Sequence, residues 1–268
     1  MAVELEFSKR PKVFNAVVDS ALMIKRSSTH ILRNTDQLLG TFFQPIMFLV
    51  LFTAVYSGAI QTGTKGSYIN FLMAGLIVQT LAFGSTTTAL AVANDLQKGI
   101  IDRFKSLPMS NFAVLSGHVV SDVLRNMLST TVLIVAGLVI GFRPDASVVD
   151  WLTIIGLTVL LTLSFSWLSA ILGIVAKSVE GVQWLSFIVV FPLTFASSAF
   201  VNPEMMSSWL RGFAENQPIT HIVDTYRSLL VGTPLDDSWW IATLWLVGII
   251  AVSMPLAAWL FKNKTTTN

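Results

Sequence analysis

The chain has 268 residues, of which 53% are hydrophobic and only 12% are charged, with a net charge of +2. Soluble domains carry about 25% charged residues, so this sequence has too little polar surface for a single globular domain in water. The absence of cysteine excludes a disulfide scaffold, thiolate catalysis and cysteine-ligated zinc. The modest net charge gives no reason to expect a nucleic-acid partner. The composition therefore predicts an integral membrane protein.

Residues 1–37 form the first expected unit, a cytosolic and interfacial segment without the apolar stretch of a signal peptide. An apolar stripe at helical spacing precedes two cationic residues, and comprises Phe14, Val17, Val18, Ala21 and Ile24, followed by Lys25 and Arg26. This pattern is typical of a helix lying on the membrane surface. The alternative is a solvated tail whose pattern ends at Ser27.

Six stretches of the chain are candidate transmembrane helices. Five of them are charge-free runs of 23 to 26 residues, at 38–60, 68–93, 151–176, 181–203 and 238–261. Each exceeds the roughly 20 helical residues that cross a hydrocarbon core about 30 Å thick. The sixth, 118–142, includes Asp122 and Arg125, whose i, i+3 spacing favours mutual neutralisation over a functional role.

The basic residues predict the orientation of the chain. With six spans, twelve lysines and arginines fall on the side that holds both termini and four fall on the other. Basic residues concentrate on the cytosolic side of membrane proteins, so both termini are expected in the cytosol. A five-span chain would place the C-terminus outside but would keep the same bias.

A cytosolic segment at 95–108 separates the second and third spans. After Gly99, one apolar stripe is formed by Ile100, Ile101, Phe104 and Leu107, while Asp102 and Arg103 lie on the other face and Pro108 keeps the helix short. A short amphipathic helix exposed to the cytosol suits docking to another protein. The alternative is a loop packed against the inner ends of its own spans.

An outer segment at 201–237 is too long for a simple connection, and two short helices are expected at 204–215 and 218–230. Pro218 suits the first turn of the second helix and Gly232 suits its end. Neither helix is long enough to span, so the pair is expected to dip into the outer leaflet and turn at Asn216 and Gln217. His221 and Asp224 could bind a metal in principle, but the polar face of the helix is the preferred interpretation.

The sequence lacks the motifs of several catalytic chemistries. It contains no Gly-x-x-x-x-Gly-Lys-Ser/Thr loop for nucleotide phosphates and no His-Glu-x-x-His metal motif. Acidic groups of the kind that couple ions to transport are not expected near the membrane midplane. No catalytic residue, metal ligand or bound cofactor is therefore predicted, and energy for any transport must come from another chain.

Three local motifs resemble those of a known family. The run from Asn94 to Ser110 is similar to the acidic-x-x-x-Gly-x-x-x-Arg-x-x-x-x-Pro coupling segment of ABC-2 type transporter permeases. The stretch from Asn216 to Arg227 is similar to the Asn-Pro…Arg element before their last span, and Gln44-Pro45 matches in the first span. The resemblance is closest to the daunorubicin-resistance-like drug-exporter branch.

This resemblance implies a single ABC-2 type transmembrane domain over 1–268, an all-α protein of six spans in the cytoplasmic membrane of a bacterium. It implies a permease for amphipathic drugs, natural products or lipids that pairs with a second copy and with two ATPase subunits, which would hold ATP and Mg. The expected ATPase-coupling residues are Gly99, Ile100, Ile101, Asp102, Arg103, Phe104, Leu107 and Pro108. The interfacial helix would meet membrane lipids through Phe14, Val18, Lys25 and Arg26, and the outer re-entrant element would use Asn216, Pro218, Asp224 and Arg227.

Other functions remain open at this stage. Within the same family, the chain could be a permease for polysaccharide, teichoic acid or another lipid-linked glycan. A membrane-embedded enzyme would need clustered acidic and histidine residues, and Asp95, Asp102 and His118 are expected near the same face without a familiar spacing. A channel or a structural scaffold is a further alternative.

Overall fold

The structure, a computed structural model, describes residues 35–56, 68–98, 111–176 and 178–266. Its elements in chain order are α3 (Thr35–Tyr56), α4 (Tyr68–Gln97), α6 (Asn111–Ile140), α7 (Val148–Val175), α8 (Val179–Phe195), the 3-10 helix η1 (Pro203–Met205), α9 (Ser208–Asn216), α10 (Pro218–Val231) and α11 (Ser238–Thr266). Throughout these ranges the regular structure is helical, which confirms the all-α class. The predictions for residues 1–34, and for the coupling segment from Gly99 to Pro108, lie outside the described residues.

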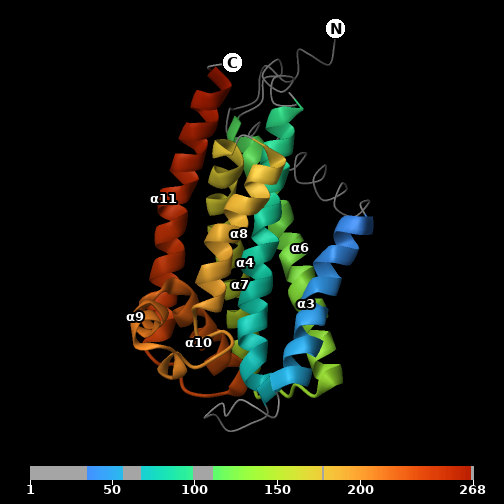
Figure 1. Ribbon diagram of the computed structural model, residues 1–268, viewed down its shortest axis with the longest axis vertical. Helices are drawn as coiled ribbons and strands as arrows, with labels where there is room; N and C mark the ends of the chain where they lie inside the picture. The colour runs from blue at the N-terminus through green and yellow to red at the C-terminus, as the bar shows by residue number, and fades with distance from the viewer. Residues whose placement is uncertain (1–34, 57–67, 99–110, 177, 267–268) are drawn as a thin grey trace.

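The long helices run side by side as a bundle around α4 (Figure 1). Helix α4 is buried along most of its length and packs against α3, α6, α7, α8 and α10. The short helices α9 and α10 lie together at the end of the bundle opposite the C-terminus of α11 (Figure 1). The large exposed side chains of α3, α7, α8 and α11 are mostly apolar, as expected for helices that face lipid.

Four helices are long and apolar enough to cross a membrane, at Tyr68–Gln97, Leu115–Ile140, Val148–Val175 and Ser238–Lys264. The first and fifth predicted spans correspond to shorter apolar helices at Phe42–Val55 and Val179–Phe195. The described residues thus contain four candidate spans, and the count of six stays a prediction.

The charge-free run 181–203 contains less helix than its length suggests, because α8 ends at Phe195. Ser197 Oγ donates to the Thr194 carbonyl at 2.6 Å and accepts from the Ala199 amide at 3.2 Å. A serine that bonds to nearby backbone in this way competes with continuation of the helix. The chain consequently turns over residues 196–201, and Ala199 and Phe200 are buried in that turn.

Other boundaries differ from expectation in smaller ways. Helix α6 already begins at Asn111, before the expected 118. Helix α9 begins at Ser208 and not at 204, because Pro203–Met205 form a separate turn that Asn202 caps. Helix α10 follows its prediction closely, from Pro218 to Val231, and Gly232 closes it with a left-handed φ of 68°.

Candidate functional site

Asp122 and Arg125 form a buried ion pair on α6. Their residues are only 2% and 5% exposed, and Arg125 Nη2 donates to Asp122 Oδ1 and to the Gly84 carbonyl of α4. The spacing of the two residues indicated this neutralisation. Asp122 lies seven residues into the apolar helix Leu115–Ile140, about 10 Å along its axis.

Three hydroxyl groups complete the surroundings of the Asp122 carboxylate. Thr87 and Thr88 of α4 donate to its two oxygens at 3.2 and 2.9 Å, and Ser166 of α7 donates to Oδ2. A charge inside a membrane protein is tolerated only when it is paired and hydrogen-bonded in this way. The network therefore joins α4, α6 and α7 at one point.

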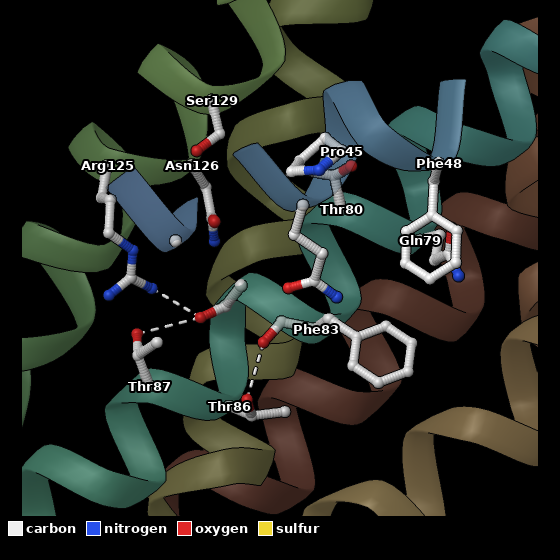
Figure 2. Close-up of a pocket in the computed structure, with 13 residues that line it drawn as sticks. Pro45, Phe48, Gln79, Thr80, Phe83, Thr86, Thr87, Arg125, Asn126 and Ser129 are labelled. Atoms are coloured by element: carbon white, nitrogen blue, oxygen red, sulfur yellow. Dashed lines mark hydrogen bonds between the residues drawn. The ribbon is translucent and has the colours of Figure 1, made fainter. Parts of the chain in front are cut away.

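A cavity of about 320 Å³ adjoins this network, between α3, α4 and α6 (Figure 2). Its apolar lining includes Pro45 and Phe48 of α3 and Phe83 of α4. The remaining lining residues are Gly40, Gln44, Gln79, Thr80, Gly84, Thr86, Thr87, Arg125, Asn126 and Ser129. Sites for small molecules commonly combine an apolar wall with a few polar groups in a volume of roughly 300–1,000 Å³.

Four polar atoms around this cavity have no hydrogen-bond partner in the described structure, namely Gln79 Nε2, Arg125 Nε, Asn126 Oδ1 and Ser129 Oγ. Leaving one such atom unpaired in a protein interior costs about 1–3 kcal/mol. Gln79, Asn126 and Ser129 were not predicted from the sequence. The available signal was the presence of amides, Gln79 and Asn126, inside predicted spans.

The expected outer element contains a second, partly buried ion pair, between Asp224 and Arg227 of α10. Arg227 Nη1 donates to Asp224 Oδ1 at 2.7 Å, and Nη2 donates to the Ser198 carbonyl at 2.6 Å. Its guanidinium carbon lies 3.8 Å from the centre of the Phe71 ring of α4. The pair thus ties α10 to the turn after α8 and to the central helix.

Burial changes the acidity of both partners, which lie outside the spanning helices. It raises the pKa of Asp224 above its ordinary value, although the Arg227 charge and a 2.7 Å hydrogen bond from Ser198 Oγ act in the opposite direction. Burial lowers the pKa of Arg227 to about 10. At neutral pH Arg227 still carries its charge, so the pair is held by an ionic hydrogen bond.

Asn216 and Pro218 lie at the junction of α9 and α10, away from this ion pair. The exposed Asn216 donates to the Gly212 carbonyl at 2.8 Å, and Pro218 begins α10. The buried residue between them is Gln217, whose Nε2 donates to the Ala196 carbonyl in the turn after α8. A turn was expected here from the sequence, and in the structure Gln217 anchors it.

Asp95 and His118 meet at the other end of the bundle. Asp95 Oδ2 of α4 lies 3.0 Å from His118 Nε2 of α6, and both side chains are 13% exposed. The structure therefore brings together two of the three residues considered for an enzyme, and Asp102 lies outside the described ranges. Within those ranges, no group of three or more His, Asp or Glu residues could hold a metal ion.

Comparison with known proteins places the chain among transport permeases. Residues 20–231 match the family described as ABC-2 type transporter. The daunorubicin resistance ABC transporter permease protein DrrB1 of Streptomyces coeruleorubidus is 32% identical over 263 residues, which are 97% of this chain and 92% of that protein. The probable doxorubicin resistance ABC transporter permease protein DrrC of Mycobacterium tuberculosis is 23% identical, over 95% of this chain and 94% of its own length. The inner membrane transport permease YadH of Escherichia coli K12 is 20% identical, over 82% and 86%.

Proposed function

Because the chain belongs to the ABC-2 type transporter family, we propose that it is the permease subunit of an ATP-driven exporter of amphipathic drugs, natural products or lipids. The observation that carries this proposal is the similarity to DrrB1, which extends over nearly the whole of both chains. Both of these relatives are named for resistance to a drug, daunorubicin or doxorubicin. Their names favour a drug-like substrate over a lipid-linked glycan.

The proposed arrangement has six spans with both termini in the cytosol, and α9 and α10 form a re-entrant pair in the outer leaflet. Two observations support this arrangement. Helices α9 and α10 lie at the end of the bundle opposite the C-terminus (Figure 1). Helix α10 packs against α11, α4 and α7, so it belongs to the bundle even though its 14 residues are too few to span it.

The proposed energy source is a separate ATPase that docks on the 95–108 segment, with two copies serving a dimer of this chain. ATP and Mg would be bound by that partner, since the sequence has no phosphate-binding loop of its own. The Asp95–His118 contact supports this proposal, because it fixes the ends of α4 and α6 from which the segment departs. A force on the segment would act on two helices that both line the cavity.

Efflux measurements test whether this chain is the permease and a separate ATPase supplies the energy. Cells that express the chain together with the proposed ATPase subunit should export daunorubicin, and cells that express either protein alone should not. The Phe104→Ala variant should lose about 1–3 kcal/mol of contact with the ATPase if Phe104 is buried in that partner. Co-purification of the ATPase and export should both fall.

The matched control is Lys105→Ala, which changes the expected polar face of the same segment and should leave both readouts near the wild-type level. Unchanged co-purification and export in Phe104→Ala would overturn the docking assignment. Export without any ATPase would overturn the permease proposal as a whole.

A further inference from the structure

We propose that α9 lies flat on the lipid bilayer, bound through one apolar face, and that this contact holds the turn after α8 at a fixed depth in the membrane. The proposal rests on the proposed function, because it takes the α9 end of the bundle as the outer one. It also refines the re-entrant pair. Helix α10 enters the bundle, whereas α9 stays at the boundary between lipid headgroups and acyl chains.

The apolar face of α9 consists of Trp209 and Phe213, extended by Met205 of the preceding η1. Trp209 and Phe213 are four residues apart, so they lie on the same side of the helix. Their side chains remain 79% and 48% exposed, and Met205 is exposed as well. Adjacent large apolar side chains exposed in this way mark a contact with lipid or with another protein.

The opposite side of α9 is polar. Arg211 and Glu215 are two residues beyond Trp209 and Phe213, about half a helical turn away. Arg211 Nε donates to Glu215 Oε1 at 2.6 Å, and both side chains are exposed. Charged groups are costly inside the hydrocarbon, so this side must remain near water. A short helix with one face of each kind matches a helix that lies in the membrane interface.

The position of α9 in the fold favours lipid as the partner of its apolar face. In Figure 1 the long helices run vertically and α9 is seen nearly end-on, so its axis lies across the bundle. Helix α11 begins at the same end, with the exposed residues Trp239 and Trp240. Tryptophan collects at the membrane–water interface, and Trp209 extends this belt from α11 to α9.

Buried hydrogen bonds connect α9 to the turn after α8. Thr220 Oγ1 of α10 donates to the Ala214 carbonyl of α9 and accepts from the Ser198 amide in the turn at 3.2 Å. Gln217 Nε2, between α9 and α10, donates to the Ala196 carbonyl. Displacement of α9 from the membrane surface would therefore strain the hydrogen bonds that hold the turn.

Spin labelling of the full chain in lipid nanodiscs tests the contact with lipid. Because the chain has no cysteine, one label at a time can be attached to Trp209→Cys, Phe213→Cys, Arg211→Cys or Glu215→Cys. Collisions with oxygen, which dissolves in lipid, and with a water-soluble nickel chelate give the depth of each label. Labels at 209 and 213 should lie about 5–10 Å into the boundary between headgroups and acyl chains, and labels at 211 and 215 should collide with nickel.

Two further labels provide the references. Val252→Cys lies on the exposed side of α11, and Asp237→Cys lies in the connection before that helix. If labels at 209 and 213 met nickel as often as the label at Asp237→Cys, the contact with lipid would be overturned. Low accessibility to both reagents would overturn it equally, because protein would then cover the face. Dipolar coupling between labels on two copies would identify that protein as a second copy of the chain.

Proteolysis in nanodiscs tests the effect on the turn. The double variant Trp209→Ala with Phe213→Ala should increase the rate of trypsin cleavage after Arg211 about tenfold, because α9 would leave the surface more often. It should also allow chymotrypsin to cleave after Phe200, which is buried in the turn. Faster cleavage after Arg211 with Phe200 still protected would overturn the effect on the turn.

The matched control is the double variant Trp184→Ala with Phe187→Ala. It removes two aromatic side chains of α8 that are exposed to a similar extent as Trp209 and Phe213. Cleavage after Arg211 and Phe200 should stay at the wild-type rate. Equal cleavage in the two double variants would contradict a specific role of the α9 face.

Export measurements separate this proposal from the proposed function. ATP-driven export by a chain whose labels at 209 and 213 lie in water would overturn the α9 contact and leave the exporter standing. Labels at the predicted depth in a chain that does not export with its ATPase would support the contact and overturn the proposed function.

Discussion

The Asp122 carboxylate shows how one residue can join three helices of a membrane bundle. It accepts hydrogen bonds from Thr87 and Thr88 of α4, from Arg125 of its own helix and from Ser166 of α7. Asp122→Asn would leave the Arg125 charge buried without a counter-ion, at a cost of about 3–5 kcal/mol. We expect a large decrease in the midpoint of thermal unfolding in detergent, measured by tryptophan fluorescence.

Two comparisons show whether the uncompensated charge of Arg125 causes the destabilisation of Asp122→Asn. The double variant Asp122→Asn with Arg125→Gln removes both charges and should be more stable than Asp122→Asn alone. Glu215→Gln breaks the exposed pair with Arg211, whose side chains are 42% and 46% exposed, and should cost less than about 1 kcal/mol. If Asp122→Asn were as stable as the double variant, charge compensation would not hold this site together.

The sequence could predict only part of this arrangement. The i, i+3 spacing of Asp122 and Arg125 was enough to expect their pairing, because neighbours on one helix face meet whatever the fold. Thr88 and Ser166 lie 34 and 44 residues from Asp122, and nothing in their local sequence distinguishes them from other hydroxyl residues in apolar helices. The cavity was missed for the same reason, since three separate helices supply its walls.

At the scale of elements, the turn after α8 depends on a close approach to α4. A Cβ atom on Gly75 would lie 2.1 Å from the Ala199 carbonyl oxygen, and neither backbone can move easily. We expect Gly75→Ala to lower the free energy of unfolding by about 1–3 kcal/mol and to increase protease cleavage between 196 and 217. Thermal unfolding and limited proteolysis would measure the two effects.

Gly156→Ala in α7 is the matched control, because no atom lies within 4 Å of the added methyl group. The control should be neutral or stabilising by up to about 1 kcal/mol, as expected for alanine in place of glycine within a helix. Equal stability of the two variants would contradict a tight contact between α4 and the turn.

Elements with local end signals were predicted better than elements ended by distant contacts. Pro218 and Gly232 are such signals, and α10 was placed to within one residue. The end of α8 has only a weak local signal, the pair Ser197 and Ser198 in a run that is otherwise apolar up to Val201. The turn is also held by Arg227, which binds the Ser198 carbonyl from 29 residues further along the chain.

At the scale of the whole molecule, the two ends of the bundle are built from different elements. The C-terminus of α11 and the ends of α4 and α6 nearest the coupling segment lie at one end, and α9 and α10 lie at the opposite end (Figure 1). Helices α4 and α6 connect these ends past the cavity and the Asp122 network. Movement of the 95–108 segment, where the ATPase is proposed to dock, would therefore reach the cavity through α4 and α6.

Because different elements lie at the two ends of the bundle, single cysteines can test the orientation of the chain in the membrane. Ser208 is exposed at the start of α9, and Ser106 belongs to the coupling segment outside the described residues. With both termini in the cytosol, a membrane-impermeant maleimide should label Ser208→Cys in intact cells and Ser106→Cys only after permeabilisation. Ser253→Cys, buried in α11, should stay unlabelled in both conditions. The reverse pattern would place the coupling segment outside the cell, where no ATP-driven partner could act on it.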